Sequence, residues 1–151
     1  MADSGSIPFF EADPLLWDDV NNVGLRSNYI CCVHAAKMMA KRETGLIVNI
    51  SSAGGLQYTF NVPYGVGKAA VDRMSADMAV ELRPYGVAIV SLWPGMVRTE
   101  FSKILMDEDK LGKMVQQSNV CYQYSCTSYE INFSLRRSVV CCLFLQTYVK
   151  V

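Results

Sequence analysis

The sequence predicts an α/β fold with a parallel sheet, for three reasons. Two short apolar runs, residues 46–50 and 87–93, are rich in β-branched side chains and are predicted to be strands buried on both faces. Residues 64–83, which lie between them, follow a helical pattern with many alanines and methionines. A helix that joins two buried strands in this way is the βαβ crossover of a parallel sheet.

A long amphipathic helix is expected before the first strand, ending at about residue 41. Asp13 and Pro14 are suited to open it, as the N-cap and as the first helical residue. Gly24 costs about 1 kcal/mol relative to alanine inside a helix, so it marks a kink or a close contact. Gly45 stands after the helix, where a left-handed cap is expected.

The 151 residues are enough for one domain. Residues 1–12 are predicted to be irregular, and residues 13–118 to form the α/β unit. Residues 119–151 form a divergent tail that contains four cysteines and neither glycine nor proline. Its apolar run at 138–145 is far shorter than the roughly 20 apolar residues that a membrane span needs. A buried strand is the favoured interpretation of this run, and an interfacial segment is the alternative. Nothing in the tail's pattern is expected to join it to the α/β unit.

Composition excludes several classes of partner and site. Lys plus Arg balance Asp plus Glu at 14 each, so no nucleic-acid partner is indicated. No stretch is long enough to cross a membrane. The single histidine, His34, is expected to pack on the first helix, and a metal site is poorly supplied. Six cysteines without a secretory signal predict free thiols and an intracellular location, in the cytoplasm or at the endoplasmic reticulum surface.

Candidate reactive residues cluster where the predicted strands end. Ser51 and Ser52 follow the first strand, and residues 94–99 follow the second. Ligands of such sheets bind beyond the carboxyl ends of the strands. Tyr64 and Lys68 open the crossover helix and lie four residues apart, so their side chains emerge from one face. An isolated pair of this kind is more often an exposed tyrosine beside a solvated lysine, and only its position favours a site.

The Tyr–Lys pair suits proton transfer. A phenol has a pKa near 10 and is a poor base at neutral pH. An ammonium about 4 Å away contributes up to about 4 kcal/mol, which would lower a phenol pKa by up to about three units. Such a pair is therefore a candidate general acid/base, and a nearby serine hydroxyl can hold a carbonyl or alcohol oxygen. This arrangement fits hydride transfer between a carbonyl compound and a nicotinamide.

Three segments together resemble the short-chain dehydrogenase/reductase family. They are GLIVNISS at 45–52, YGVGKAA at 64–70 and WPGMVRT at 93–99, and they stand in the family's order and spacing. The resemblance covers about residues 9–115 and implies a partial Rossmann-type, doubly wound unit: its helix–strand–helix–strand segment.

The resemblance also implies roles for individual residues. Tyr64 would be the acid/base, Lys68 would assist it, and Ser52, with Ser51 as an alternative, would orient the substrate oxygen. The substrate would be a small carbonyl or alcohol compound, and the cofactor NAD or NADP. The residues implied at the nicotinamide end of the cofactor are Tyr64, Lys68, Pro94, Gly95, Val97 and Thr99.

The sequence departs from the family in three places. Gly24 stands where the family has a catalytic asparagine. Asn21 to Gly24 imitates a strand motif of the family but lies inside the predicted helix. No glycine-rich turn follows an early strand, so the half that grips the pyrophosphate is missing from this sequence. We therefore expect little dinucleotide binding by the chain alone. The alternative to an oxidoreductase is a non-catalytic fragment that associates, as a homo-oligomer, through its two long helices.

Overall fold

The computed structural model describes residues 7–94, residue 100 and residues 143–145. In these parts the chain alternates helices and strands, as the sequence predicts. The elements are α1 (Leu16–Asn21), a π-helical turn (Asn22–Arg26), α2 (Ser27–Ala40), β1 (Gly45–Ile50), a 3-10 turn (Ala53–Gly55), α3 (Val62–Leu82), a 3-10 turn (Arg83–Tyr85), β2 (Val87–Pro94) and β3 (Leu143–Leu145).

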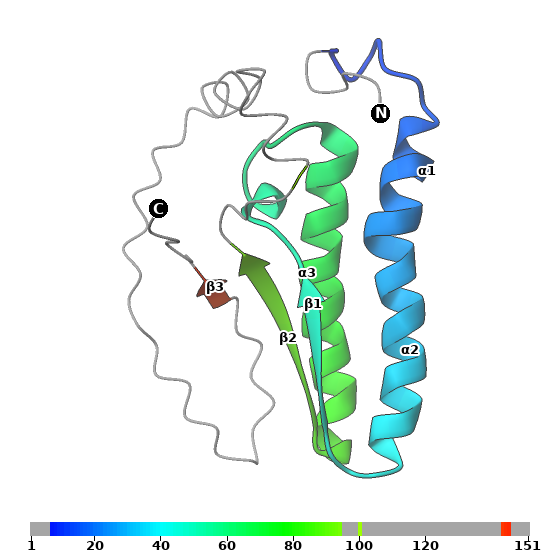
Figure 1. Cartoon of the computed structure of the whole chain (residues 1–151), viewed down its shortest axis with the longest axis vertical. Helices are drawn as coiled ribbons and strands as arrows, with labels where there is room; N and C mark the ends of the chain where they lie inside the picture. Colours follow the sequence, from blue (N-terminus) through cyan, green and yellow to red (C-terminus); the bar gives the residue numbers. More distant parts are fainter. Residues whose placement is uncertain (1–6, 95–99, 101–142, 146–151) are drawn as a thin grey trace.

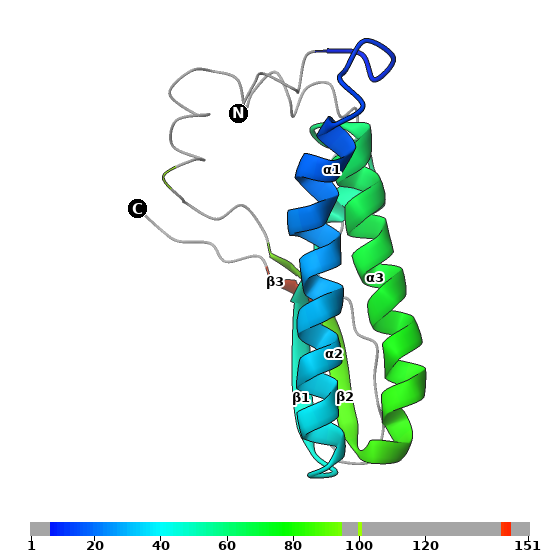
Figure 2. The ribbon, with the colours of Figure 1, turned by 90° about the vertical axis from the view of Figure 1, so that its right-hand side faces the viewer.

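The described residues form two layers, with helices on one face of a small parallel sheet. β1 and β2 pair in parallel, with Gly45 opposite Val87 and Ile50 opposite Leu92. The helix α3 connects them and lies beside α2 (Figure 1), and Figure 2 shows α2 in front of the strands and α3 to their right. The predicted βαβ crossover is thus confirmed.

A third strand corrects the interpretation of the tail. β3 pairs in parallel with the end of β2, with Leu92 opposite Leu143. The prediction of a strand in the run 138–145 is confirmed for Leu143–Leu145. The expectation that nothing in the tail joins the α/β unit is wrong at this point.

The first long helix is interrupted where its glycine stands. Helix α1 begins at Leu16, and the Asp13 carboxylate accepts a hydrogen bond from the Leu15 N–H at 2.9 Å, so Asp13 caps a turn just before the helix. Around Gly24 the helix widens into the π-helical turn, which confirms an irregularity there. The predicted left-handed cap at Gly45 is wrong. Glu43 carries the positive φ, 54°, and Gly45 already starts β1.

The core lies between the helices and one face of the sheet. It contains these buried residues: Cys32, Ile47, Ala79, Leu82, Val87 and Ile89. The other face of β1 is open, since Leu46, Val48 and Ile50 are 45%, 45% and 49% exposed. The prediction that this strand is buried on both faces is therefore wrong within the described residues. An apolar run cannot say which of its faces a helix covers.

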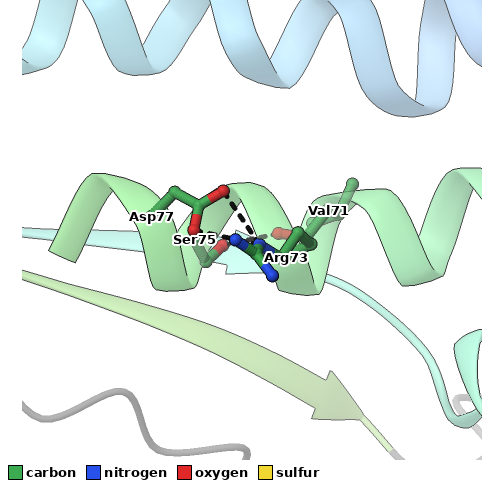
Figure 3. Close-up of polar contacts among 4 residues, drawn as sticks. All are labelled: Val71, Arg73, Ser75 and Asp77. Atoms are coloured by element: carbon green, nitrogen blue, oxygen red, sulfur yellow. Dashed lines mark hydrogen bonds and ion pairs between the residues drawn. The ribbon is translucent and has the colours of Figure 1, made fainter. Parts of the chain in front are cut away.

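A buried polar chain crosses this core from α2 to α3. The Cys32 thiol donates to the Asn49 side-chain oxygen at 3.2 Å, and the Asn49 amide donates to the Ser75 hydroxyl at 3.0 Å. The Ser75 hydroxyl donates in turn to the Val71 carbonyl at 2.8 Å, while the Arg73–Asp77 ion pair lies on the exposed side of α3 (Figure 3). Buried polar groups that are all paired fix one arrangement of the elements that carry them.

The two neighbouring cysteines are expected to differ in reactivity. Cys31 is exposed and Cys32 is 3% exposed, and both thiols are free. Burial raises the pKa of the Cys32 thiol, so less of it is the reactive thiolate at neutral pH. Iodoacetamide at neutral pH should label Cys31 and spare Cys32, as read by mass spectrometry after digestion. Equal labelling of both in the folded chain would show that α2 does not pack on β1 as described.

Two smaller observations complete the fold. His34 is exposed, so the prediction that it packs against the rest of the protein is wrong for the described residues. Among the helices that the structure describes, none combines the length and the apolar character needed to cross a lipid bilayer.

Candidate active site

The two serines after β1 have different partners. Ser51 is buried, and its hydroxyl donates to the Lys68 carbonyl at 3.1 Å. Ser52 is partly exposed, and its hydroxyl oxygen accepts from the Gly54 N–H at 3.1 Å, which caps the 3-10 turn. A Ser52 hydroxyl used only as an acceptor keeps its proton available for a ligand. Of the two serines, Ser52 is therefore the one whose hydroxyl proton is not used in the described contacts.

Two glycines let the serine loop lie directly on α3. A Cβ at Gly54 would stand 2.7 Å from Cε1 of the Tyr64 ring. A Cβ at Gly55 would stand 2.8 Å from the Ala69 backbone nitrogen and 3.0 Å from the Lys68 carbonyl carbon. The loop that carries Ser52 is therefore held against the turn of α3 that carries Tyr64 and Lys68.

The start of α3 fixes the position of Tyr64. The Asn61 side chain accepts from the Tyr64 N–H at 2.9 Å and caps the helix, with Pro63 in its first turn. Phe60 has a φ of 62°, which is uncommon for a bulky residue. Its ring meets the Tyr64 ring edge to face, with centroids 5.0 Å apart. The phenol ring is thus bounded by Phe60 on one side and by the Gly54 backbone on another.

Lys68 reaches back to the end of β1. Its Nζ donates to the Ile50 carbonyl at 3.1 Å and lies 5.8 Å from the centroid of the Tyr64 ring. Burial lowers the pKa of Lys68, and the nearby Asp72 carboxylate raises it. The contacts bring Ser52, Tyr64 and Lys68 to the carboxyl end of β1, where the strand order predicted them.

Of the other predicted site residues, only Pro94 is described. It ends β2 next to the carboxyl end of β1. Gly95, Val97 and Thr99 lie outside the described residues.

Helix α1 contacts the start of α3 through Asn21, whereas the family resemblance implied an asparagine at position 24. Among the described residues, no atom outside the local helix backbone lies within 4 Å of the point that a Cβ at Gly24 would occupy, so this position is open. One turn earlier, Asn21 is 6% exposed and its amide donates to the Pro63 carbonyl at 3.3 Å. Asn21 therefore supports the turn of α3 that precedes Tyr64.

Asp72 was not predicted from the sequence, yet it belongs to the same helix face. Its Oδ1 accepts from the Ser91 hydroxyl and, at 2.9 Å, from the Trp93 indole nitrogen. Two signals could have found it. Asp72 continues the four-residue spacing of Tyr64 and Lys68, and Ser91 is a polar residue inside an apolar strand.

Comparison with known proteins places this geometry in a family. The family model of the short chain dehydrogenases matches residues 3–110. The chain is 57% identical over 101 residues to dehydrogenase/reductase SDR family member 1 of Mus musculus, and 56% identical over 103 residues to its Homo sapiens counterpart. These matches cover 67% and 68% of this chain. The chain spans about a third of these relatives' length, 32% and 33%.

Solved structures give the same assignment. The chain is similar to ElxO with NADP bound, with a TM-score of 0.62 and 31% identity over 68% of this chain and 42% of that one. It is also similar to a short-chain type dehydrogenase/reductase from Mycobacterium ulcerans, with a TM-score of 0.64 and 27% identity over 70% of this chain and 39% of that one. With its parallel strands, its serine loop and its Tyr64–Lys68 helix, the chain belongs to the short-chain dehydrogenase family.

Proposed function

We propose that this chain supplies the reacting end of an NAD(P)-dependent oxidoreductase site, which interconverts a small carbonyl compound and its alcohol. The observation that carries the proposal is the contact of the serine loop and of the end of β1 with one turn of α3. Gly54 lies against the Tyr64 ring, and Lys68 Nζ lies 3.1 Å from the Ile50 carbonyl. In a protein of the short-chain dehydrogenase family, these residues stand where proton transfer is needed.

The chain's own residues would handle the oxygen and its proton. In the reducing direction, the Ser52 hydroxyl donates a hydrogen bond to the carbonyl oxygen and orients it. The Tyr64 hydroxyl then gives its proton to that oxygen, and the Lys68 ammonium stabilises the phenolate that forms. In the oxidising direction, the Tyr64 phenolate takes the proton of the alcohol.

A nicotinamide dinucleotide, when bound, supplies or accepts the hydride. The residues present fit its nicotinamide end. Lys68 has three ammonium donors and the described contacts use one, on Ile50, so two are available to ribose hydroxyls. Pro94, Gly95, Val97 and Thr99 would line the nicotinamide. The bound NADP of the similar ElxO structure supports a cofactor of this class.

A second candidate function is association without catalysis. A groove of about 550 Å³ runs between the two long helices, and its apolar lining includes Val33, Ala36, Met74 and Met78. A second copy of the chain could pack there with its own helices and form a homo-oligomer. We also propose an intracellular location, in the cytoplasm or at the endoplasmic reticulum surface, because Cys31 and Cys32 are free thiols.

A chimera separates catalysis from association. In the mouse relative, the matched 101-residue segment is replaced by the corresponding residues of this chain. We expect the chimera to oxidise NADPH with a carbonyl compound that the unmodified relative reduces. The 151-residue chain alone should show no saturable micromolar binding of NADH or NADPH by calorimetry, because its residues meet only the nicotinamide end.

Two outcomes would count against this assignment. A folded chimera that binds NADPH without turnover would refute the catalytic role of the segment and leave association as its function. Micromolar binding by the chain alone that Lys68→Ala abolishes would show that the nicotinamide end suffices for affinity.

A further inference from the structure

Helix α3 is tied to the sheet by polar side chains along its inner face. Near its start, the Lys68 ammonium donates a hydrogen bond to the Ile50 carbonyl, and the Ser51 hydroxyl donates one to the Lys68 carbonyl. These bonds connect α3 to β1. One turn later, the Asp72 carboxylate accepts hydrogen bonds from Ser91 and Trp93 on β2. Interfaces between helices and sheets are usually apolar, so each polar tie here calls for a reason.

The Asp72 carboxylate holds the segment of β2 that leads into the predicted cofactor loop. Its two donors, Ser91 and Trp93, alternate along β2 and therefore lie on one face of the strand. They are 0% and 5% exposed, and both bond the same carboxylate oxygen. Trp93 directly precedes Pro94. One side chain thus ties the helix of Tyr64 to two residues near the end of β2.

Asp72 also places a negative charge one helical turn from Lys68. Residues four apart on a helix are neighbours on its surface. The carboxylate acts on Lys68 in the direction opposite to burial, since burial lowers the pKa of Lys68 and Asp72 raises it.

We propose that Asp72 is a positioning residue of the oxidoreductase site, which ties the end of β2 to the helix of Tyr64 and holds a carboxylate one helical turn from Lys68. This inference rests on the proposed function for the identity of the site. The contacts of Asp72 and its action on Lys68 can be tested without cofactor or turnover.

The test measures the reactivity of Lys68 in the full 151-residue chain. Acetic anhydride reacts with neutral amines, and mass spectrometry gives the labelling rate of each lysine. In Asp72→Asn the amide oxygen can still accept from Ser91 and Trp93 while the charge is gone. We expect Lys68 to label roughly twofold to tenfold faster at neutral pH than in the wild type, because losing a negative charge one helical turn away favours the neutral amine.

Matched variants separate charge from structure. Asp72→Glu keeps the charge and should retain the wild-type labelling rate. Asp77→Asn removes a carboxylate from the exposed side of α3, where it pairs with Arg73, and should leave Lys68 unchanged. The indole N–H resonance of Trp93, one of only two tryptophans, reports whether the tie to β2 persists in each variant. Asp72→Ala should shift that resonance, while Asp72→Asn should keep it near its wild-type position.

The outcomes distinguish this inference from the proposed function. Lys68 labelling that is unchanged in Asp72→Asn would overturn the role of Asp72, even if the chimera is active. Faster labelling in Asp72→Glu, equal to that of Asp72→Asn, would also overturn it. A shifted Lys68 reactivity together with an inactive chimera would support the role of Asp72 and refute the proposed function.

Discussion

Tyr64→Phe in the chimera is expected to lower kcat for carbonyl reduction by about 10²- to 10⁴-fold, the usual contribution of a general acid/base. The phenyl ring keeps the contacts with Phe60 and Gly54, which involve only ring atoms. Within residues 7–94 no hydrogen bond involves the Tyr64 hydroxyl, so its loss should not disturb the fold of this part. Steady-state kinetics with NADPH and circular dichroism measure the two effects.

A neighbouring tyrosine provides the control. Tyr58 lies in the loop just before α3, is 56% exposed, and its hydroxyl donates to the Phe60 carbonyl at 3.4 Å. Tyr58→Phe removes the same atom from a similar place and should leave kcat within about twofold, because a long, exposed hydrogen bond contributes little. A comparable loss in both variants would mean that the loop, and not the Tyr64 proton, limits the rate.

Gly55→Ala is expected to destabilise the chimera by about 1–3 kcal/mol, the usual cost of forcing a methyl group into a filled space. The added carbon would stand 2.8 Å from the Ala69 nitrogen, a backbone atom that cannot move without shifting α3. Since Gly55 follows Ser52 on the same turn, the shift should also displace the serine loop from Tyr64. Urea unfolding gives the free energy, and NADPH oxidation gives the loss of activity.

Gly24→Ala is the matched change at an open position. In the part of the chain that the structure describes, no atom beyond the local helix backbone lies within 4 Å of a Cβ there, and Gly24 is within a helical segment. Alanine should therefore stabilise the protein by about 0.5–1 kcal/mol. If both variants lowered the stability equally, the close approach of Gly55 to α3 would not be the reason.

The placement of the candidate site residues could be predicted from the sequence because local spacing sets their geometry. The four-residue interval of Tyr64 and Lys68 on a helix, and the place of Ser52 after a strand, need no knowledge of distant contacts. The crossover that brings them together follows from the order of two apolar strands and a helix. The parallel pairing of β1 and β2 confirms this part.

What the sequence could not predict depends on contacts between distant residues. The bonds from Ser91 and Trp93 to Asp72 join residues 19 and 21 positions apart, and only the packed fold brings them together. The same holds for the open face of β1, because Leu46 and Val48 are as apolar as the buried Ile47. Glu43, and not Gly45, takes the left-handed conformation, because the exact end of a helix shifts by one or two residues relative to the sequence pattern.

Transfer of deuterium from the cofactor to the substrate is the sharpest test of the proposed carbonyl reduction with Tyr64 as the proton donor. The chimera is incubated with a carbonyl compound and NADPH that carries deuterium at the reactive C4 position, and the alcohol is analysed by mass spectrometry. We expect the chimera to form an alcohol with one deuterium on the former carbonyl carbon. In Tyr64→Phe we expect the rate of its formation to fall by about 10²-fold or more. A folded chimera that binds NADPH but forms no deuterated alcohol would contradict the proposed activity. Equal formation of that alcohol without the Tyr64 hydroxyl would contradict the role of Tyr64 as the proton donor.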